Sequence, residues 1–153
     1  MLNTLLIGAA LVLAAPAPKE APKTTAKLEG NWLLTDAVGV KGKEDVAKDH
    51  IRFIFADGNV TILTAREKGD RAEKATYEVD LTKKPATIDI KPTNGPKDLV
   101  VKGIIEISGD TLKLCFGRDG ADRPAEFKGD VEKNVQLMTF KREEEKKGEE
   151  EKK

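Results

Sequence analysis

The chain has 153 residues, 35% of them charged, and its 27 Lys and Arg residues balance its 27 Asp and Glu residues. This length fits one domain with appendages, and the lack of a basic excess argues against a nucleic-acid-binding protein, which needs positive charge to neutralise phosphates. A single cysteine excludes an internal disulfide and any metal site built from two or four cysteines of one chain.

Residues 1–14 have the composition of a secretory signal peptide. An apolar run over residues 5–15 is followed by small residues, as at the h-region and cleavage site of an exported protein. The run is too short to span a bilayer, which takes about 20 apolar residues. The alternative is an apolar tail that is not cleaved. We therefore expect export to the periplasm or the extracellular space, with no membrane span after cleavage.

Two segments of biased composition flank the middle of the chain. Residues 15–27 hold three prolines and no aliphatic side chain larger than Ala, which predicts an extended linker. Residues 143–153 consist of Glu, Lys and one Gly, which predicts a solvated, disordered tail. Glu and Lys at i,i+4 spacing leave a docking helix as the alternative for the tail. The folded domain is then expected over residues 28–142.

Alternation of apolar and polar residues predicts strands in the first half of this domain. The glycine- and charge-rich connection over residues 39–48 has room for one helical turn at 44–48. Asp57-Gly58 is a strong hairpin turn signal, and Lys83-Lys84-Pro85 is a second turn. The expected strands cover residues 32–37, 51–55, 60–64, 75–81 and 87–90.

The stretch over residues 101–116, V-K-G-I-I-E-I-S-G-D-T-L-K-L-C-F, predicts a tight hairpin. Gly109 and Asp110 stand at its centre, where a two-residue loop requires positive φ. In the second arm Leu112, Leu114 and Phe116 share one face, and Cys115 lies on the other. A last strand is expected over residues 134–140, after a loop that begins at residue 117.

About eight short strands, joined mostly by short turns, predict an all-β fold. Sequential hairpins favour an up-and-down antiparallel barrel of the lipocalin type, because closing eight strands on themselves removes exposed sheet edges. A two-sheet β-sandwich is the alternative.

Five segments carry a family resemblance. They are L-E-G-N-W at residues 28–32, A-T-I-D-I at 86–90, G-I-I-E-I-S-G-D-T-L-K-L-C-F at 103–116, R-P-A-E-F at 123–127 and T-F-K-R at 139–142. Through them the chain resembles an uncharacterised family of secreted planctomycete domains described as lipocalin-like. The resemblance implies a barrel and carries no established activity.

Gly30-x-Trp32 is also similar to the G-x-W signature that opens lipocalins. In lipocalins this Trp closes one end of the barrel, and an Arg from the last strand lies across it. The resemblance implies the same role for Trp32, with either Lys141 or Arg142 across the ring. Arg123, followed by Pro124, is expected to act as a structural clamp over the barrel rim.

The sequence offers no catalytic or metal-binding constellation. His50 is the one histidine, and without a second ligand at suitable spacing it predicts a loop or cap residue. Cys115 has no cationic neighbour that would activate its thiol, so we expect a small buried hydrophobic residue. Asp119, Asp122 and Asp130 stand among arginines without the spacing of a calcium loop, which favours turns and salt bridges. We therefore predict no cofactor, no metal and no enzymatic activity.

The predicted function is that of a secreted, monomeric barrel that binds a small hydrophobic molecule inside it. The alternative is a filled barrel that serves as a structural or protein-interaction module of the cell envelope. The candidate ligand-binding residues are Trp32, Phe53, Phe55, Tyr77, Ile88, Ile105, Leu112, Leu114 and Phe116, with Leu34, Ile62, Val79, Ile90, Ile107 and Leu137 as further lining.

Overall fold

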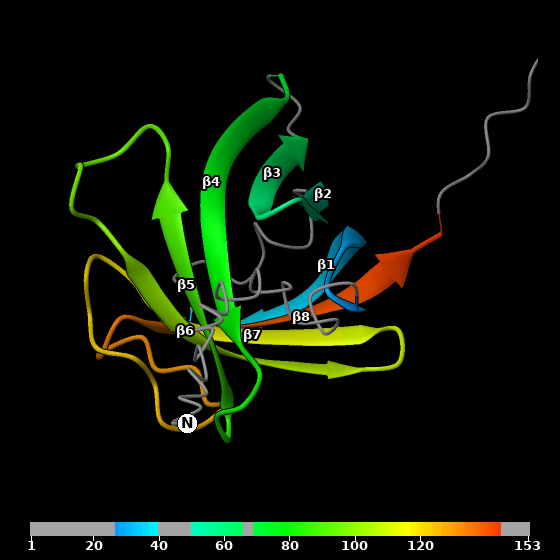
Figure 1. Ribbon diagram of the computed structural model, residues 1–153. Helices are drawn as coiled ribbons and strands as arrows, with labels where there is room; N and C mark the ends of the chain where they lie inside the picture. Colours follow the sequence, from blue (N-terminus) through cyan, green and yellow to red (C-terminus); the bar gives the residue numbers. More distant parts are fainter. Residues whose placement is uncertain (1–26, 40–49, 66–68, 145–153) are drawn as a thin grey trace, which may run out of the picture.

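Eight antiparallel strands close into one barrel in the computed structural model, which describes residues 27–39, 50–65 and 69–144 (Figure 1). Each strand pairs with its neighbours in sequence, and β1 closes the barrel against β8. The predicted all-β barrel is confirmed, and the sandwich alternative is wrong. The strands are β1 (Gly30–Val38), β2 (His50–Ala56), β3 (Asn59–Ala65), β4 (Arg71–Asp80), β5 (Ala86–Pro92), β6 (Val101–Ser108), β7 (Thr111–Gly117) and β8 (Val135–Glu143).

The ends of the predicted domain need one correction. Glu143, assigned above to the disordered tail, is the last residue of β8, and its carboxylate accepts a 2.7 Å hydrogen bond from Nε of Arg52. Alternation of apolar and polar residues does not show whether such a residue belongs to a strand or to a charged tail, because the outer face of a barrel strand tolerates charge. The predicted signal peptide, the helical turn at 44–48, and all but one residue of both the linker and the rest of the tail lie outside the described residues.

The two tight hairpins use different turns. Asp57 and Gly58 both have positive φ, 50° and 74°, as a type I′ turn requires. In the β6–β7 hairpin Gly109 alone has positive φ, 56°, which fits a type II′ turn with Gly at its first central position. The predicted tight turn with a primed geometry is present, and Asp110 needs no left-handed conformation in it.

Alternate residues of every strand meet inside the barrel and form its core. Four aromatic rings lie at the centre: the Phe53 centroid is 4.8 Å from that of Phe140 and 6.2 Å from that of Phe55, which is 5.1 Å from Tyr77. The buried cluster consists of Leu28, Trp32, Phe53, Phe55, Val60, Ala75, Tyr77, Ile88, Ile90, Ile105, Leu112, Leu114 and Phe140.

One residue predicted to line the interior lies elsewhere, and the smallest interior residue is closely packed. Leu137 does not line the barrel, because it pairs with Cys115 on the outer face, and Met138 and Phe140 point inward instead. Gly103, the smallest interior residue, does not leave a cavity. A Cβ atom there would lie 3.1 Å from Cβ of Phe116, whose ring-bearing side chain packs against the core.

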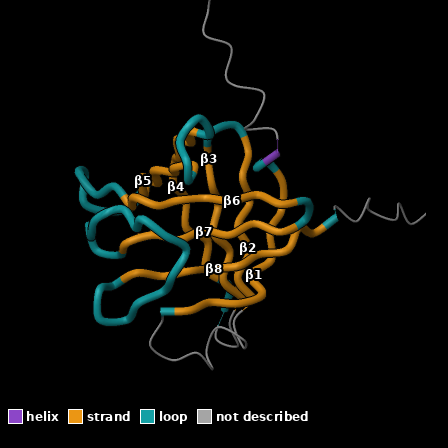
Figure 2. Tube along the Cα trace, turned by 90° about the horizontal axis from the view of Figure 1, so that it is seen from below, coloured by secondary structure: helices purple, strands orange, loops and turns teal. Residues whose placement is uncertain are grey.

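A second buried layer lies outside the barrel wall. Ile104 and Cys115 are 1% and 0% exposed although both alternate with core residues. The long β7–β8 loop runs beside these strands (Figure 2) and covers Cys115, whose sulfur lies 3.5 Å from the carbonyl oxygen of Glu126 and 3.7 Å from that of Lys128. The loop therefore gives the outer face of β6 and β7 a small core of its own.

Candidate functional site

One end of the barrel is closed by Trp32. The Trp32 side chain is fully buried, and its Nε1 donates a 2.7 Å hydrogen bond to the carbonyl oxygen of Leu28, itself 1% exposed. The Arg142 guanidinium lies 4.2 Å from the centroid of the Trp32 ring. Of the two cations that the sequence offered for this position, Arg142 occupies it, and Lys141 is exposed.

Arg142 also ties together the segments that meet at this end. Its Nη1 donates a 2.8 Å hydrogen bond to the Glu29 carbonyl, and its Nη2 donates one to the Lys27 carbonyl. Its backbone N–H donates to the carbonyl of Asp110 in the β6–β7 turn, at 2.8 Å. A Cβ atom at Gly30, where φ is +125°, would lie 2.8 Å from Nη1 of Arg142. Glycine at this position is thus explained by its φ and by the close approach of the arginine.

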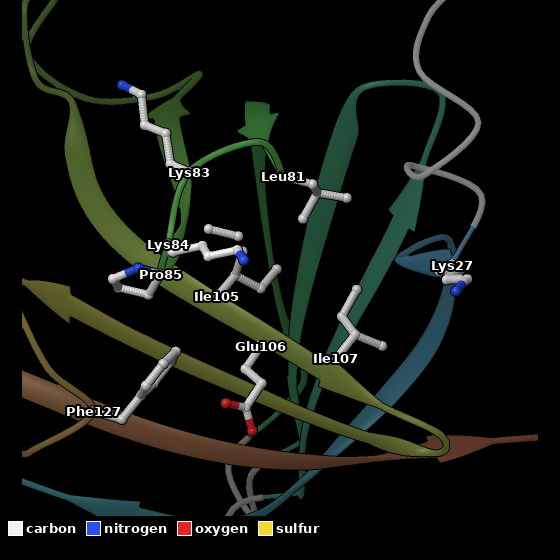
Figure 3. A pocket seen from close by; sticks show the side chains of 10 residues that line it. Lys27, Leu81, Lys83, Lys84, Pro85, Ile105, Glu106, Ile107 and Phe127 are labelled. Atoms are coloured by element: carbon white, nitrogen blue, oxygen red, sulfur yellow. The ribbon is translucent and has the colours of Figure 1, made fainter.

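Beside this closed end, the barrel wall has a gap between β5 and β6. Pairing of β5 with β6 begins at Ala86, opposite Ile105, whereas β6 runs on to Ser108 with β7 as its partner. Among the described strands, residues 106–108 therefore have no partner on the β5 side. The pocket at this gap, shown in Figure 3, has a volume of about 350 Å³. It is lined by Lys27, Leu81, Lys83, Lys84, Pro85, Ala86, Ile105, Glu106, Ile107 and Phe127.

The pocket combines apolar walls with a cationic rim. Leu81 follows directly after β4, Ile105 lies in β6 and Phe127 lies in the β7–β8 loop. Lys83 and Lys84 lie in the β4–β5 turn, and the third lysine is Lys27, whose carbonyl Arg142 binds. In Figure 3 the Lys84 side chain is directed toward the middle of the pocket, whereas Lys83 extends away from it.

The wall of the pocket also offers backbone polar groups. Ser108 and Thr111 close a two-residue hairpin loop, so they form a hydrogen-bonded pair across β6 and β7. Because hydrogen-bonded and non-hydrogen-bonded pairs alternate in an antiparallel ladder, the N–H and C=O of Ile107 point away from β7, toward the gap. A ligand in the pocket therefore has a backbone donor and acceptor within its reach.

The nine residues predicted to bind a ligand lie inside the barrel or pack against its core. They contact one another as a packed interior does: Trp32, Leu112 and Leu114 are 0% exposed. Of the nine, Ile105 alone also lines the wall pocket. Ile107, which the sequence offered as further lining, lines the pocket too. The sequence pattern missed most of the other pocket residues because they lie in turns, in the linker and in an irregular loop, where alternation carries no information, and it missed Ala86 and Glu106 although they lie in strands.

Tyr77 is a core residue with an unusual hydroxyl. Its side chain is buried, and its hydroxyl finds no hydrogen-bond partner among the described residues. Burial raises the pKa of Tyr77, and the carboxylates of Glu29 and Asp57 raise it further, against a smaller opposite effect of the Gly58 backbone. The group is therefore held neutral, and it has no proton-transfer partner within the described part of the barrel.

The remaining chemically active residues have structural surroundings. His50 is exposed at the start of β2, opposite Ala65. Burial raises the pKa of the Cys115 thiol, which keeps it protonated. Asp130 accepts hydrogen bonds from the backbone N–H groups of Glu132 and Lys133, as in a capped turn. Within the described ranges, no three His, Cys, Asp or Glu side chains gather closely enough to hold a metal ion.

Arg123 holds the β7–β8 loop against the wall rather than over the rim. Its Nη1 donates hydrogen bonds to the carbonyls of Gly103, at 2.7 Å, and Ile88, at 3.3 Å. Its Nη2 lies 2.7 Å from the Asp89 carboxylate on the outer face of β5. Pro124, half-buried, follows it in the loop. The arginine thus joins the loop to β5 and β6.

In the described part of the chain, no helix has the length and apolar character needed to cross a membrane. No protein-family model matches the sequence, and no curated protein matches it significantly. The resemblance to the secreted planctomycete domains therefore stays a prediction from the five segments that carry it.

Proposed function

We propose that the protein is a non-enzymatic module that binds a small molecule in the wall pocket beside Trp32. The observation that carries the proposal is the gap between β5 and β6, where a pocket of about 350 Å³ has apolar walls and a few polar groups at its edge. Ligand pockets have volumes of about 300–1,000 Å³ and the same mixture of apolar lining and sparse polar groups. The pocket therefore suits a small ligand.

The packing of the interior supports the wall as the site rather than the barrel lumen. The Phe53 and Phe140 rings are in contact, with centroids 4.8 Å apart, and Leu114 is fully buried. An eight-stranded barrel is just wide enough for side chains to fill it. A ligand between these rings would have to displace them, whereas the wall pocket is already open.

The alternative of a protein-interaction module has less support. Among large apolar side chains of the described residues, Val131 alone is exposed, at 43%. Protein-binding surfaces are usually contiguous apolar patches of several hundred Å², and one valine does not make such a patch. The wall pocket is the stronger feature.

The proposal includes export of the protein to the periplasm or the extracellular space. The apolar run over residues 5–15 and the small residues after it support this location. Mass spectrometry of the protein purified from its own host tests it, because cleavage after residue 14 shortens the chain. A full-length chain beginning at Met1 contradicts this part of the proposal.

Methyl NMR of the full chain titrated with decanol tests the binding site. We expect chemical-shift changes at the methyl groups of Leu81, Ile105 and Ile107, with those of Leu114 unchanged. Changes centred on Leu114 would move the site back into the lumen. A spectrum that decanol leaves unchanged throughout would contradict small-molecule binding of this kind.

A further inference from the structure

We infer that the ligand of the wall pocket is a single-chain carboxylate, with its apolar tail in the pocket and its anionic head at the lysine rim. This inference rests on the proposed function and names the chemical class of the ligand. It depends on the distribution of charge at the pocket, on the backbone of β6, and on the size of the cavity.

Charge at the rim favours an anion. Lys27, Lys83 and Lys84 line the pocket, against one carboxylate, that of Glu106. Glu106 alternates with the inward-facing Ile105, and its carboxylate lies 4.0 Å from the ammonium group of Lys113 on the outer face. Figure 3 shows this carboxylate on the opposite side of the pocket from Lys83 and Lys84. Among the described lining residues, the lysine side of the rim therefore carries no carboxylate.

The backbone of β6 adds a directional donor beside this charge. The N–H of Ile107 points toward the gap, for the reason given by the hairpin register. A carboxylate oxygen that accepts this N–H and lies close to the Lys84 ammonium group makes two charge-assisted hydrogen bonds, which are stronger than neutral ones. Lys84 is the lysine whose side chain is directed into the pocket, so we assign the head group to it.

The same register argues against a peptide as the occupant. A peptide that adds to a sheet edge needs several outward N–H and C=O groups in a row. Ile105 is already paired with Ala86, and the turn begins at Gly109, so Ile107 alone directs its backbone groups into the gap. One residue of free edge is too short for strand addition, and it is enough for one head group.

The cavity limits the ligand to one short tail. A volume of about 350 Å³ suits a medium-length chain lying against Leu81, Ile105 and Phe127. It does not suit the two long chains of a phospholipid. Apolar walls with a cationic edge also match the division of a carboxylate into an apolar tail, which the pocket buries, and a charged head, which stays at the edge.

Isothermal titration of the full chain with decanoate and with decanol, below their aggregation concentrations, tests the inference. We expect decanoate to bind at least about tenfold more tightly at low salt, and the difference to shrink as salt screens the rim. Equal affinities would overturn the inference while leaving the pocket and the proposed function intact. Failure of both probes to bind would overturn the proposed function and the inference with it.

Two exposed lysines, one in the pocket lining and one outside it, give a matched pair of variants for the same titration. Lys84→Ala should weaken decanoate binding about three- to fivefold, the size of one partly exposed ion pair, and leave decanol binding unchanged. Lys97→Ala, in the exposed β5–β6 loop, should change decanoate binding by less than about twofold, because this residue lies outside the pocket lining. Equal losses from both variants would overturn the assignment of the head group to Lys84.

Discussion

The guanidinium of Arg142 lies 4.2 Å from the centroid of the Trp32 ring. The last strand thus places a cation across the residue of the first strand that closes one end of the barrel. The same guanidinium donates to the carbonyls of Lys27 and Glu29. Arg142 therefore stabilises the barrel closure and holds the segment that brings Lys27 to the pocket rim. These two roles separate in experiment, because one concerns unfolding and the other ligand binding.

Arg142→Ala should lower the free energy of unfolding by about 1–3 kcal/mol, because it removes two charged hydrogen bonds and a cation–π contact. Urea unfolding followed by the fluorescence of Trp32, the one tryptophan of the chain, measures this directly. Lys141→Ala is the matched control. Its side chain is exposed on the other face of β8, so its effect should stay within about 0.5 kcal/mol. Equal effects of the two variants would show that the Arg142 contacts do not stabilise the closure.

Leu114→Ala should destabilise the protein by about 2–5 kcal/mol, because the side chain is fully buried among other core residues and its truncation leaves a cavity. Lys113→Ala, its neighbour on the outer face, should cost less than about 1 kcal/mol, since its 4.0 Å ion pair with Glu106 is exposed. Chemical denaturation of both variants makes the comparison. A cost below about 1 kcal/mol for Leu114→Ala would mean that the interior is not packed around this residue.

Tyr77→Phe should leave stability unchanged or raise it by about 1 kcal/mol at neutral pH, because the lost hydroxyl has no partner among the described residues. The pKa of Tyr77 is raised in the folded state. Above about pH 10 the unfolded chain therefore loses this proton first, and folding stability falls as pH rises. The variant should lack this alkaline loss.

Urea unfolding of wild type and Tyr77→Phe at neutral and alkaline pH supplies both comparisons. The chain has one tyrosine, so the difference between the two proteins belongs to this residue. A destabilisation of more than about 1 kcal/mol at neutral pH would show that the hydroxyl is satisfied in the folded protein.

Arg123→Gln should raise the reactivity of Cys115 toward a thiol reagent. Arg123 holds the β7–β8 loop to β5 and β6, and the same loop places Glu126 and Lys128 over the Cys115 sulfur. In the wild type, burial raises the pKa of the thiol and shields it, so labelling under native conditions should be slow. The rate at which Ellman's reagent labels Cys115 in the two proteins measures the change in reactivity.

Arg118→Gln is the control for the loop experiment. It lies in the same loop with an exposed side chain, so labelling of Cys115 should keep the wild-type rate. If Arg123→Gln also keeps that rate, the arginine does not hold the loop over the sulfur.

The strands were predictable wherever alternation was strict. In β7 each step along the chain changes the face, so Leu112 and Leu114 face inward and Cys115 faces outward. The apolar residues of the inner face are too many to be left exposed to solvent. The same rule failed at Leu137, because an outer face covered by a loop is as apolar as an inner one. Register, and not composition, decided that Phe140 and not Leu137 enters the core.

The wall pocket was not predictable from the sequence. It depends on where β5 begins relative to β6, and a strand offset of two or three residues leaves no pattern in either strand. Lys83, Lys84 and Pro85 are recognisable as a turn, but their place at a gap follows from the offset. Lys27 lines the pocket from the linker, and its carbonyl accepts a hydrogen bond from Arg142, which is distant in sequence.

Closure of the barrel through β1 and β8 places Asn31 directly opposite Glu143. The two ends of the folded unit thus lie side by side, and none of the eight ladders requires the chain to start where it does. Circular permutation is the consequence: a short linker joining these ends, with new termini opened in the exposed β5–β6 loop over residues 93–98, preserves every strand pair. The order of strands around the barrel, rather than the position of the first residue, defines this fold.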